Sequence, residues 1–290
     1  MGVHRPVRVA TSDFTVRGHR LTYTEFGEGK RWVLLMPGLL FPAAMQNPLA
    51  LALAERGAHV LTLDPLGHGL SDRPHSMLEY SIRSYATDAI ALLDHLDIDE
   101  AIVGGTSLGA NVTLEVANVA PNRVRGMIIE MPVLENALVA TAITFGPILV
   151  ALHFGEHLIR PIAAVLRRIP RRLAPFWINI ALDTVRQEPG PSGAVLQGVF
   201  FSHIAPHRAQ RQQLQMPALV IGHHIDPVHP LSDAGMLVEE LPRGRLVEAS
   251  DILELRLRPK RITAEIAAFV EECWSPRAVA KPRRQSRRSA

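Results

Sequence analysis

The sequence is poor in cysteine and lacks several motifs that would define a protein class. Cys273 is its one cysteine in 290 residues, so an intramolecular disulfide is excluded and no cysteine spacing indicates a metal site. No G-x-G-x-x-G pattern of a dinucleotide-binding loop is present, and we expect no cofactor. Residues 1–13 contain no apolar core of a signal peptide, so we expect a cytoplasmic location.

Histidine and aspartate gather in one short segment that could be mistaken for a metal site. His223, His224, Asp226 and His229 lie within seven residues of each other, and such side chains can bind zinc. Neighbouring residues at the end of a strand point to opposite faces of the sheet. We therefore expect no common metal centre here.

Acidic residues are absent from the last sixteen residues, 275–290. This segment has six basic residues and almost nothing apolar to bury, which predicts a disordered basic tail. Without these six charges, the formal net charge of +3 becomes −3. The body of the protein is therefore not basic, and we expect no specific nucleic-acid binding. A solubilising role for the tail and weak contact with an anionic membrane surface are both consistent with it.

Strands and helices alternate through most of the chain. Short apolar runs predict strands, and apolar residues at helical spacing predict helices between them. Such alternation indicates an α/β fold with a doubly wound, mostly parallel sheet covered by helices on both faces. The expected strands lie in residues 14–27, 32–36, 59–64, 101–103, 124–131, 218–222 and 245–248, and the expected helices in residues 43–56, 82–96, 109–119, 234–240 and 261–273.

The alternation stops in the middle of the chain. Residues 133–213 are helical in character and are punctuated by prolines, and no strand pattern returns before residue 218. We therefore expect a helical cap at 133–213, inserted after the sixth strand. It separates a first core part (12–132) from a second core part (214–274).

The cap begins with a stretch that has no charged residue. Residues 137–152 are interrupted by Gly146-Pro147 and are short for a membrane span. Five arginines follow between residues 160 and 172. One interpretation is a cap helix that packs on the core, with a basic outer face. The other is an apolar substrate tunnel or a membrane-surface patch.

A serine lies at a sharp turn in the pattern. Gly105-Thr-Ser-Leu-Gly109 follows an apolar run and precedes an amphipathic stretch, which predicts strand, tight turn and helix. Small residues are needed on both sides of Ser107, because the backbone is strained and the helix packs close to the strand. The hydroxyl would be exposed at the end of a sheet. It needs a base to become a good nucleophile.

Four motifs in order resemble the α/β-hydrolase superfamily. They are Gly105–Gly109, Met36-Pro-Gly-Leu39, Asp64-Pro-Leu-Gly-His-Gly-Leu-Ser71 and Pro217-Ala-Leu-Val-Ile-Gly-His-His-Ile-Asp226. The resemblance covers residues 14–273. It implies that Ser107 is the nucleophile, that the N–H groups of Leu39 and Leu108 form an oxyanion hole, and that Asp226 is the acid of a triad. Asp64 and His68 would be structural.

The histidine that the resemblance requires is missing from its usual place. The strand at 245–248 is followed by Ser250 and Asp251, and no histidine lies beyond His229. A relocated base is one explanation. His229, three residues after Asp226, is its best candidate, and His223, His224, His203 and His207 are alternatives. A second explanation is ligand binding without hydrolysis, and a third is catalysis by Ser107 with the oxyanion hole alone.

The sequence therefore predicts a serine hydrolase that acts through a Ser107 acyl-enzyme. Its substrate would be a small ester, thioester or lactone with an apolar acyl part. The alternative is a catalytically degenerate protein of the same fold that binds an apolar ligand or a partner. A lyase or other non-hydrolytic activity is a third reading, since a fold does not fix a function. Neither the substrate nor the oligomeric state follows from the sequence.

Overall fold

The computed structural model describes residues 6–168, 170–171 and 174–275. Within them, eight strands form one sheet in the order β1-β2-β4-β3-β5-β6-β7-β8. The basic tail predicted at 275–290 lies, apart from Ser275, outside the described residues. The strands are β1 (Val9–Val16), β2 (His19–Phe26), β3 (Trp32–Met36), β4 (His59–Leu63), β5 (Ala101–Thr106), β6 (Val124–Glu130), β7 (Ala218–Ile225) and β8 (Gly244–Asp251).

The sheet is mostly parallel, as the sequence predicted. Strand β2 pairs antiparallel with β1 and β4, and all pairings from β4 through β8 are parallel. The chain leaves β3 toward one edge and β5 toward the other, so the strand order reverses between these two neighbours. In open α/β sheets, ligands bind at the carboxyl ends of the strands at such a switch point. A site is therefore expected in the segments that follow β3 and β5.

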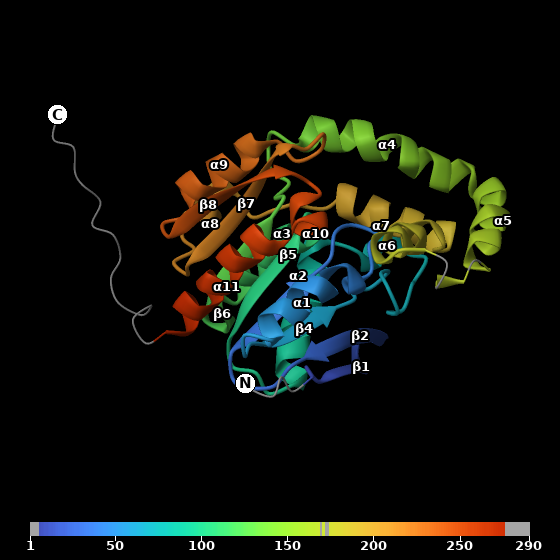
Figure 1. Ribbon diagram of the computed structural model, residues 1–290. Coiled ribbons are helices and arrows are strands. Elements are labelled where there is room, and N and C mark those ends of the chain that lie inside the picture. Colours follow the sequence, from blue (N-terminus) through green and yellow to red (C-terminus); the bar gives the residue numbers. More distant parts are fainter. Residues whose placement is uncertain (1–5, 169, 172–173, 276–290) are drawn as a thin grey trace, which may run out of the picture.

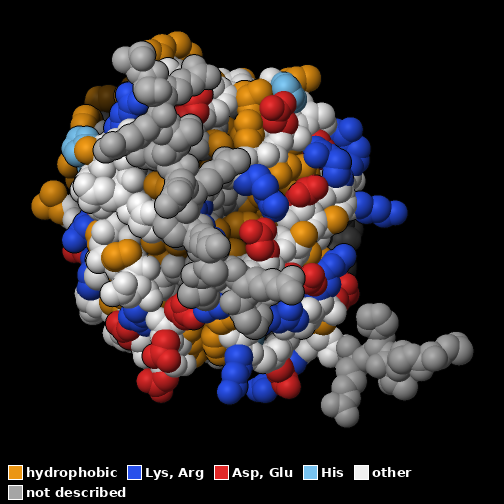
Figure 2. All heavy atoms as spheres, turned by 90° about the vertical axis from the view of Figure 1, so that its left-hand side faces the viewer, with side chains coloured by type: hydrophobic (Ala, Val, Ile, Leu, Met, Phe, Trp, Pro, Cys, Tyr) orange, Lys and Arg blue, Asp and Glu red, His pale blue; other side chains and the backbone are white. Residues whose placement is uncertain are grey.

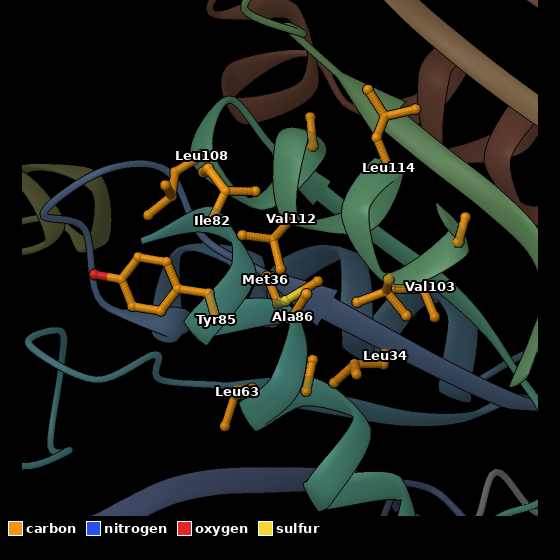
Figure 3. Packing of buried hydrophobic residues seen from close by; sticks show 14 of the residues in the cluster. Leu34, Met36, Leu63, Ile82, Tyr85, Ala86, Val103, Leu108, Val112 and Leu114 are labelled. Carbon is orange, nitrogen blue, oxygen red and sulfur yellow. The ribbon is translucent and has the colours of Figure 1, made fainter. Parts of the chain in front are cut away.

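Helices cover both faces of the sheet (Figure 1). One face packs against α1 (Asn47–Ala54) and α11 (Lys260–Trp274). The other packs against α2 (Ile82–His95), α3 (Leu108–Val119) and α9 (Leu231–Glu240). Figure 3 shows the apolar core on this second face of the sheet. There, Leu34, Met36 and Val103 of the strands meet side chains of α2 and α3. Burial of these apolar side chains holds α3, and with it the turn that precedes it, against the sheet.

One predicted helix differs in detail. Residues 43–56 were expected to form a single helix, but the segment begins as the 3-10 turn η1 (Ala43–Gln46) and continues as α1. Pro48 lies in the first turn of α1, where a missing N–H costs nothing. The helix ends before Gly57, whose φ of +81° suits glycine.

Among the described residues between β6 and β7, five helices are present: α4 (Leu138–Phe154), α5 (Glu156–Arg167), α6 (Phe176–Val185), α7 (Pro189–Phe200) and the short α8 (Arg208–Arg211). Figure 1 shows α4 and α5 at the outer margin of the molecule, beyond α7 and α6. Pro147 lies inside α4 and Pro161 inside α5. The division into core and cap at residues 133 and 213 stays a prediction. Among the described residues, no single helix is long and apolar enough to cross a membrane.

Candidate active site

Ser107 occupies a strained turn between β5 and α3. Its φ and ψ are +53° and −107°, a conformation that non-glycine residues rarely adopt. A Cβ on Gly105 would lie 2.6 Å from the backbone of Gly109, and a Cβ on Gly109 would lie 2.5 Å from the carbonyl oxygen of Met36. Both contacts are too short for any side chain. The two glycines are therefore required by the close approach of α3 to the sheet.

Ser107, His229 and Asp226 form a continuous chain of hydrogen bonds. The Oγ atom of Ser107 lies 2.9 Å from Nε2 of His229, and Nδ1 of His229 lies 2.8 Å from Oδ2 of Asp226. A carboxylate accepts, so Nδ1 carries the proton and Nε2 accepts from the serine hydroxyl. The sequence named these three residues. The geometry brings them together in the arrangement of a nucleophile, a base and an orienting acid.

The carboxylate of Asp226 is buried and firmly held. Its side chain is 2% exposed, and its second oxygen accepts the backbone N–H groups of Val228 and His229. Burial alone would raise the pKa of Asp226, but the hydrogen bond and charge of His229, together with these two N–H groups, hold that pKa below its usual value. Asp226 therefore stays ionised and can stabilise a positive charge on His229.

Leu39 follows β3, and Leu108 is the first residue of α3. Leu39 and Leu108 both line the cavity at Ser107. Among the described residues, the N–H groups of Leu39 and Leu108 donate no backbone hydrogen bond in a turn, loop or cap. Such groups can stabilise an oxyanion. The oxyanion hole that the resemblance implies at these two residues stays a prediction.

The cavity at Ser107 is small and apolar. Its volume is about 40 Å³, and its walls include Phe145 of α4 and Val199 and Phe200 of α7. Thr141 adds a buried hydroxyl that has no hydrogen-bond partner among the described residues. The inserted helices thus cover Ser107 with mainly apolar side chains.

The other candidate histidines make different contacts. His223 is buried and directs Nδ1 to the carbonyl oxygen of Asp251, whereas His224 is exposed and pairs with Glu248. The two rings therefore point to opposite sides of β7, as expected. His203 and His207 are exposed and pack on each other, with ring centroids 4.3 Å apart. Among the described residues, no group of three or more His, Cys, Asp or Glu side chains could hold a metal ion.

Ser250 and Asp251, where the resemblance would expect a histidine base, make structural contacts instead. Ser250 and Asp251 end β8, and the Asp251 carboxylate accepts from Arg258 and from the backbone N–H of Leu253. These contacts cap the turn into α10 (Glu254–Leu257).

Asp64 and His68 hold the loop after β4. The Asp64 carboxylate accepts the backbone N–H groups of Ala43 and Leu70, at 2.6 and 2.9 Å. His68 is fully buried, and burial lowers the pKa of its imidazole to about 4. A neutral imidazole bonded to the carbonyl oxygen of Leu66 is consistent with a structural role.

Sequence reasoning missed a polar network beneath the turn. Glu130, at the end of β6, accepts two hydrogen bonds from Arg256 of α10 and one from the hydroxyl of Thr106. Its own carbonyl oxygen accepts the N–H of Ser107 at 2.8 Å. Burial opposes ionisation, yet Arg256 and His223 hold the pKa of Glu130 well below its usual range. The network fixes the strand end from which the serine projects.

Asn111 and Asp233 were also missed. The Asn111 side chain, one turn after Ser107, donates to the carbonyl oxygens of Val133 and Ile204 and accepts the N–H of Val133. Asp233 of α9 is buried and accepts three backbone N–H groups at the start of the inserted helices, those of Leu134, Asn136 and Ala137. No local pattern in the sequence distinguishes either residue. Both tether the inserted helices to the sheet.

An eight-stranded, mostly parallel sheet with a serine on a strained turn after β5 defines the α/β-hydrolase class of fold. The family model of the alpha/beta hydrolase fold matches residues 31–252, and the chain belongs to this family. The fold predicted from the sequence is thereby confirmed.

Curated relatives include a protein named as an enol-lactonase. The chain is 28% identical over 266 residues to 3-oxoadipate enol-lactonase 2 of Acinetobacter baylyi, covering 85% of this chain and 92% of that protein. An uncharacterised protein of Mycobacterium tuberculosis is 37% identical over 129 residues, which are 43% of this chain and only 37% of that protein. The solved structure of the enol-lactonase from Burkholderia xenovorans superposes with a TM-score of 0.72 at 22% identity, over 90% of this chain and all of that one. This structural likeness shows the fold alone.

Proposed function

We propose that the protein is a serine hydrolase that cleaves an ester, thioester or lactone with a short apolar acyl part. The observation that supports this most directly is the hydrogen-bond chain from Ser107 through His229 to Asp226. The enol-lactonase among the relatives is consistent with a lactone or ester substrate. The relocated base is the explanation that this geometry favours over ligand binding without hydrolysis.

In the proposed reaction, the Oγ atom of Ser107 attacks the carbonyl carbon while Nε2 of His229 takes the hydroxyl proton. The negative charge that develops on the carbonyl oxygen is stabilised by the N–H groups of Leu39 and Leu108. Asp226, held ionised, stabilises the imidazolium that forms. Collapse of the intermediate breaks the bond to the leaving oxygen or sulfur, which takes the proton from Nε2. Water then repeats the sequence on the acyl-enzyme and releases the acid.

The apolar cavity supports the acyl specificity. The alcohol or thiol part would lie toward the entrance. The acyl chain would contact Phe145, Val199 and Phe200. Burial of each methylene against such a wall contributes about 0.8 kcal/mol.

The test is labelling with a fluorophosphonate, read by intact mass. We expect one adduct on the parent protein and none on Ser107→Ala. We also expect labelling to slow strongly in His229→Ala, because the serine would lose its base. A folded parent that forms no adduct would contradict the proposal and favour the ligand-binding alternative.

A further inference from the structure

The helices α4 and α5 have an apolar outer surface. Exposed aliphatic and aromatic side chains recur at helical spacing along both helices. We call this set the outer rows: Val139, Ile143, Val150 and Phe154 of α4, and Leu158, Ile162 and Val165 of α5, each 56–76% exposed. So many large apolar side chains on two consecutive helices are unusual for a surface that faces only water.

The charged residues near the outer rows are almost all basic, and they lie on and after α5. Helix α4 contains no Asp, Glu, Lys or Arg in 17 residues. Arg160 and Arg167 lie on α5 and Arg168 directly follows it; all three are exposed, and Arg167 also donates to the backbone carbonyl oxygen of Arg186. Glu156 is the one acidic residue in the sequence from 138 to 168. By contrast, the face shown in Figure 2, on the other side of the molecule from α5, intermixes basic and acidic side chains.

We propose that the outer rows dock on an anionic lipid surface. Apolar side chains would enter the boundary between headgroups and acyl chains, and the arginines would meet the anionic headgroups, which is the pattern of interfacial helices. Taken together, α4 and α5 have the length of a span, but they are bent by 94° at their junction. A bent pair of this kind is consistent with helices that lie on a bilayer.

A second copy of the chain is a less suitable occupant. A two-fold interface uses the same patch on both subunits. The arginines of α5 would then be brought together from both copies, and residues 138–168 of each copy contain a single acidic residue in sequence. A lipid surface supplies the missing negative charge without this repulsion.

The inner side of α4, opposite the outer rows, faces the cavity at Ser107. Thr141 and Phe145, on the inner side of this helix, line the cavity at Ser107. A single layer of helix therefore separates the outer rows from the serine. Docking itself does not depend on hydrolysis, but delivery of an amphiphilic ester from the lipid would rest on the proposed function.

The experiment is vesicle flotation of the full chain. We would compare vesicles of phosphatidylcholine alone with vesicles of phosphatidylcholine and phosphatidylglycerol in equal amounts. The parent should float with the mixed vesicles, and less so as salt is added. In Leu158→Glu/Ile162→Glu, the affinity should fall on the order of tenfold or more, because two apolar side chains are replaced by acids.

Leu78→Glu is the matched control, since Leu78 is 84% exposed but lies on η2 (Met77–Glu79), outside the outer rows. It should float like the parent. All variants keep the basic tail, so binding through the tail alone would leave them equal and overturn the proposal. The proposal would also be overturned if the parent did not float. The same holds if the parent bound no vesicles but formed a dimer, and the double variant was a monomer.

Two further measurements keep folding and catalysis apart from docking. If the acidic variant does not fold, the milder variant Leu158→Ser/Ile162→Ser replaces it. This variant should weaken flotation several-fold. Hydrolysis of a soluble ester without vesicles should be unchanged in the double variants, and Ser107→Ala should float like the parent. Loss of flotation with retained hydrolysis thus tests docking alone.

Discussion

Asp226 and His229 lie three residues apart in one loop and are joined by two hydrogen bonds. Oδ1 of Asp226 accepts the backbone N–H of His229 at 2.9 Å, and Oδ2 lies 2.8 Å from Nδ1 of the same residue. The loop between β7 and α9 therefore holds an acid and its imidazole as one local unit. The loop after β8, from which the resemblance would draw a histidine, is free to take a structural role.

Replacement of His229 tests this unit. If His229 is the base, His229→Ala should lower kcat on the order of 10³-fold or more with a soluble p-nitrophenyl ester, because the Ser107 hydroxyl loses its proton acceptor. The matched control is His224→Ala on the preceding strand, whose exposed ring pairs with Glu248; it should retain activity. Full activity in His229→Ala would move attention to His203 or His207.

Asn111 should be needed to hold the inserted helices over the serine. Asn111→Ala removes an amide that serves Val133 and Ile204, and each buried group left unpaired costs about 1–3 kcal/mol. We expect lower stability, faster proteolysis between α4 and α7, and a lower kcat/KM. Asn118→Ala on the same helix, where the side chain meets Glu115, should change stability by no more than about 0.5 kcal/mol. Equal proteolysis of the two variants would refute the tether.

The network beneath the turn predicts a contrast between two arginines. Arg256 is almost buried and donates to both oxygens of Glu130, so Arg256→Met leaves a buried carboxylate without its main partner. We expect a loss of about 3–5 kcal/mol in the free energy of unfolding. Arg258→Met breaks an exposed pair with Asp251 and should have a much smaller effect. Urea denaturation of both variants gives the comparison, and similar losses would contradict this assignment.

His223 predicts a pH dependence of stability. Burial would lower the pKa of His223, but the Glu130 carboxylate, 3.4 Å from Nε2, and the carbonyl oxygen of Asp251 raise it above its usual value, against a smaller opposing effect of Arg256. A raised pKa means that the folded state binds the proton more tightly than the unfolded state. This contribution is complete below the unfolded pKa of about 6.5 and is lost as the pH rises through the higher folded value.

The variant His223→Gln should therefore flatten the alkaline side of the stability profile. Between about pH 6 and pH 9, the parent should lose more free energy of unfolding than the variant. Urea midpoints at both pH values measure this difference. Parallel changes in the two proteins would show that His223 does not titrate with folding in that range.

The sequence predicted what depends on short segments. Gly105 and Gly109 around Ser107 predict the turn because their spacing reflects a local steric need, and the alternation of apolar runs predicts the parallel sheet. The base remained open among five histidines, because the distance from His229 to Ser107, 122 residues away, depends on how the β7 loop lies against the β5 turn. Its catalytic role stays a prediction, now with a defined geometry.

Short sequence segments could not predict the residues that support the site, Asn111, Glu130 and Arg256. Asn111 has the appearance of an ordinary helix residue, and its partners are 22 and 93 residues away. Glu130 and Arg256 are separated by 126 residues. Such pairs leave no periodic signal, because their contact is produced by the assembled sheet and the helices packed on it.

The size of the cavity predicts the acyl preference. A space of about 40 Å³ beside Ser107 holds only a few carbon atoms, so p-nitrophenyl acetate or butyrate should be cleaved faster than the laurate ester. Phe145→Ala should enlarge the acyl pocket and raise the relative kcat/KM for longer chains, since each added methylene that becomes buried contributes about 0.8 kcal/mol. Phe201→Ala is a suitable control, because Phe201 is exposed and is not among the residues that line the cavity. If Phe145→Ala left the order of the three esters unchanged while Ser107 still formed its adduct, the acyl chain would bind elsewhere, toward the entrance rather than beneath α4.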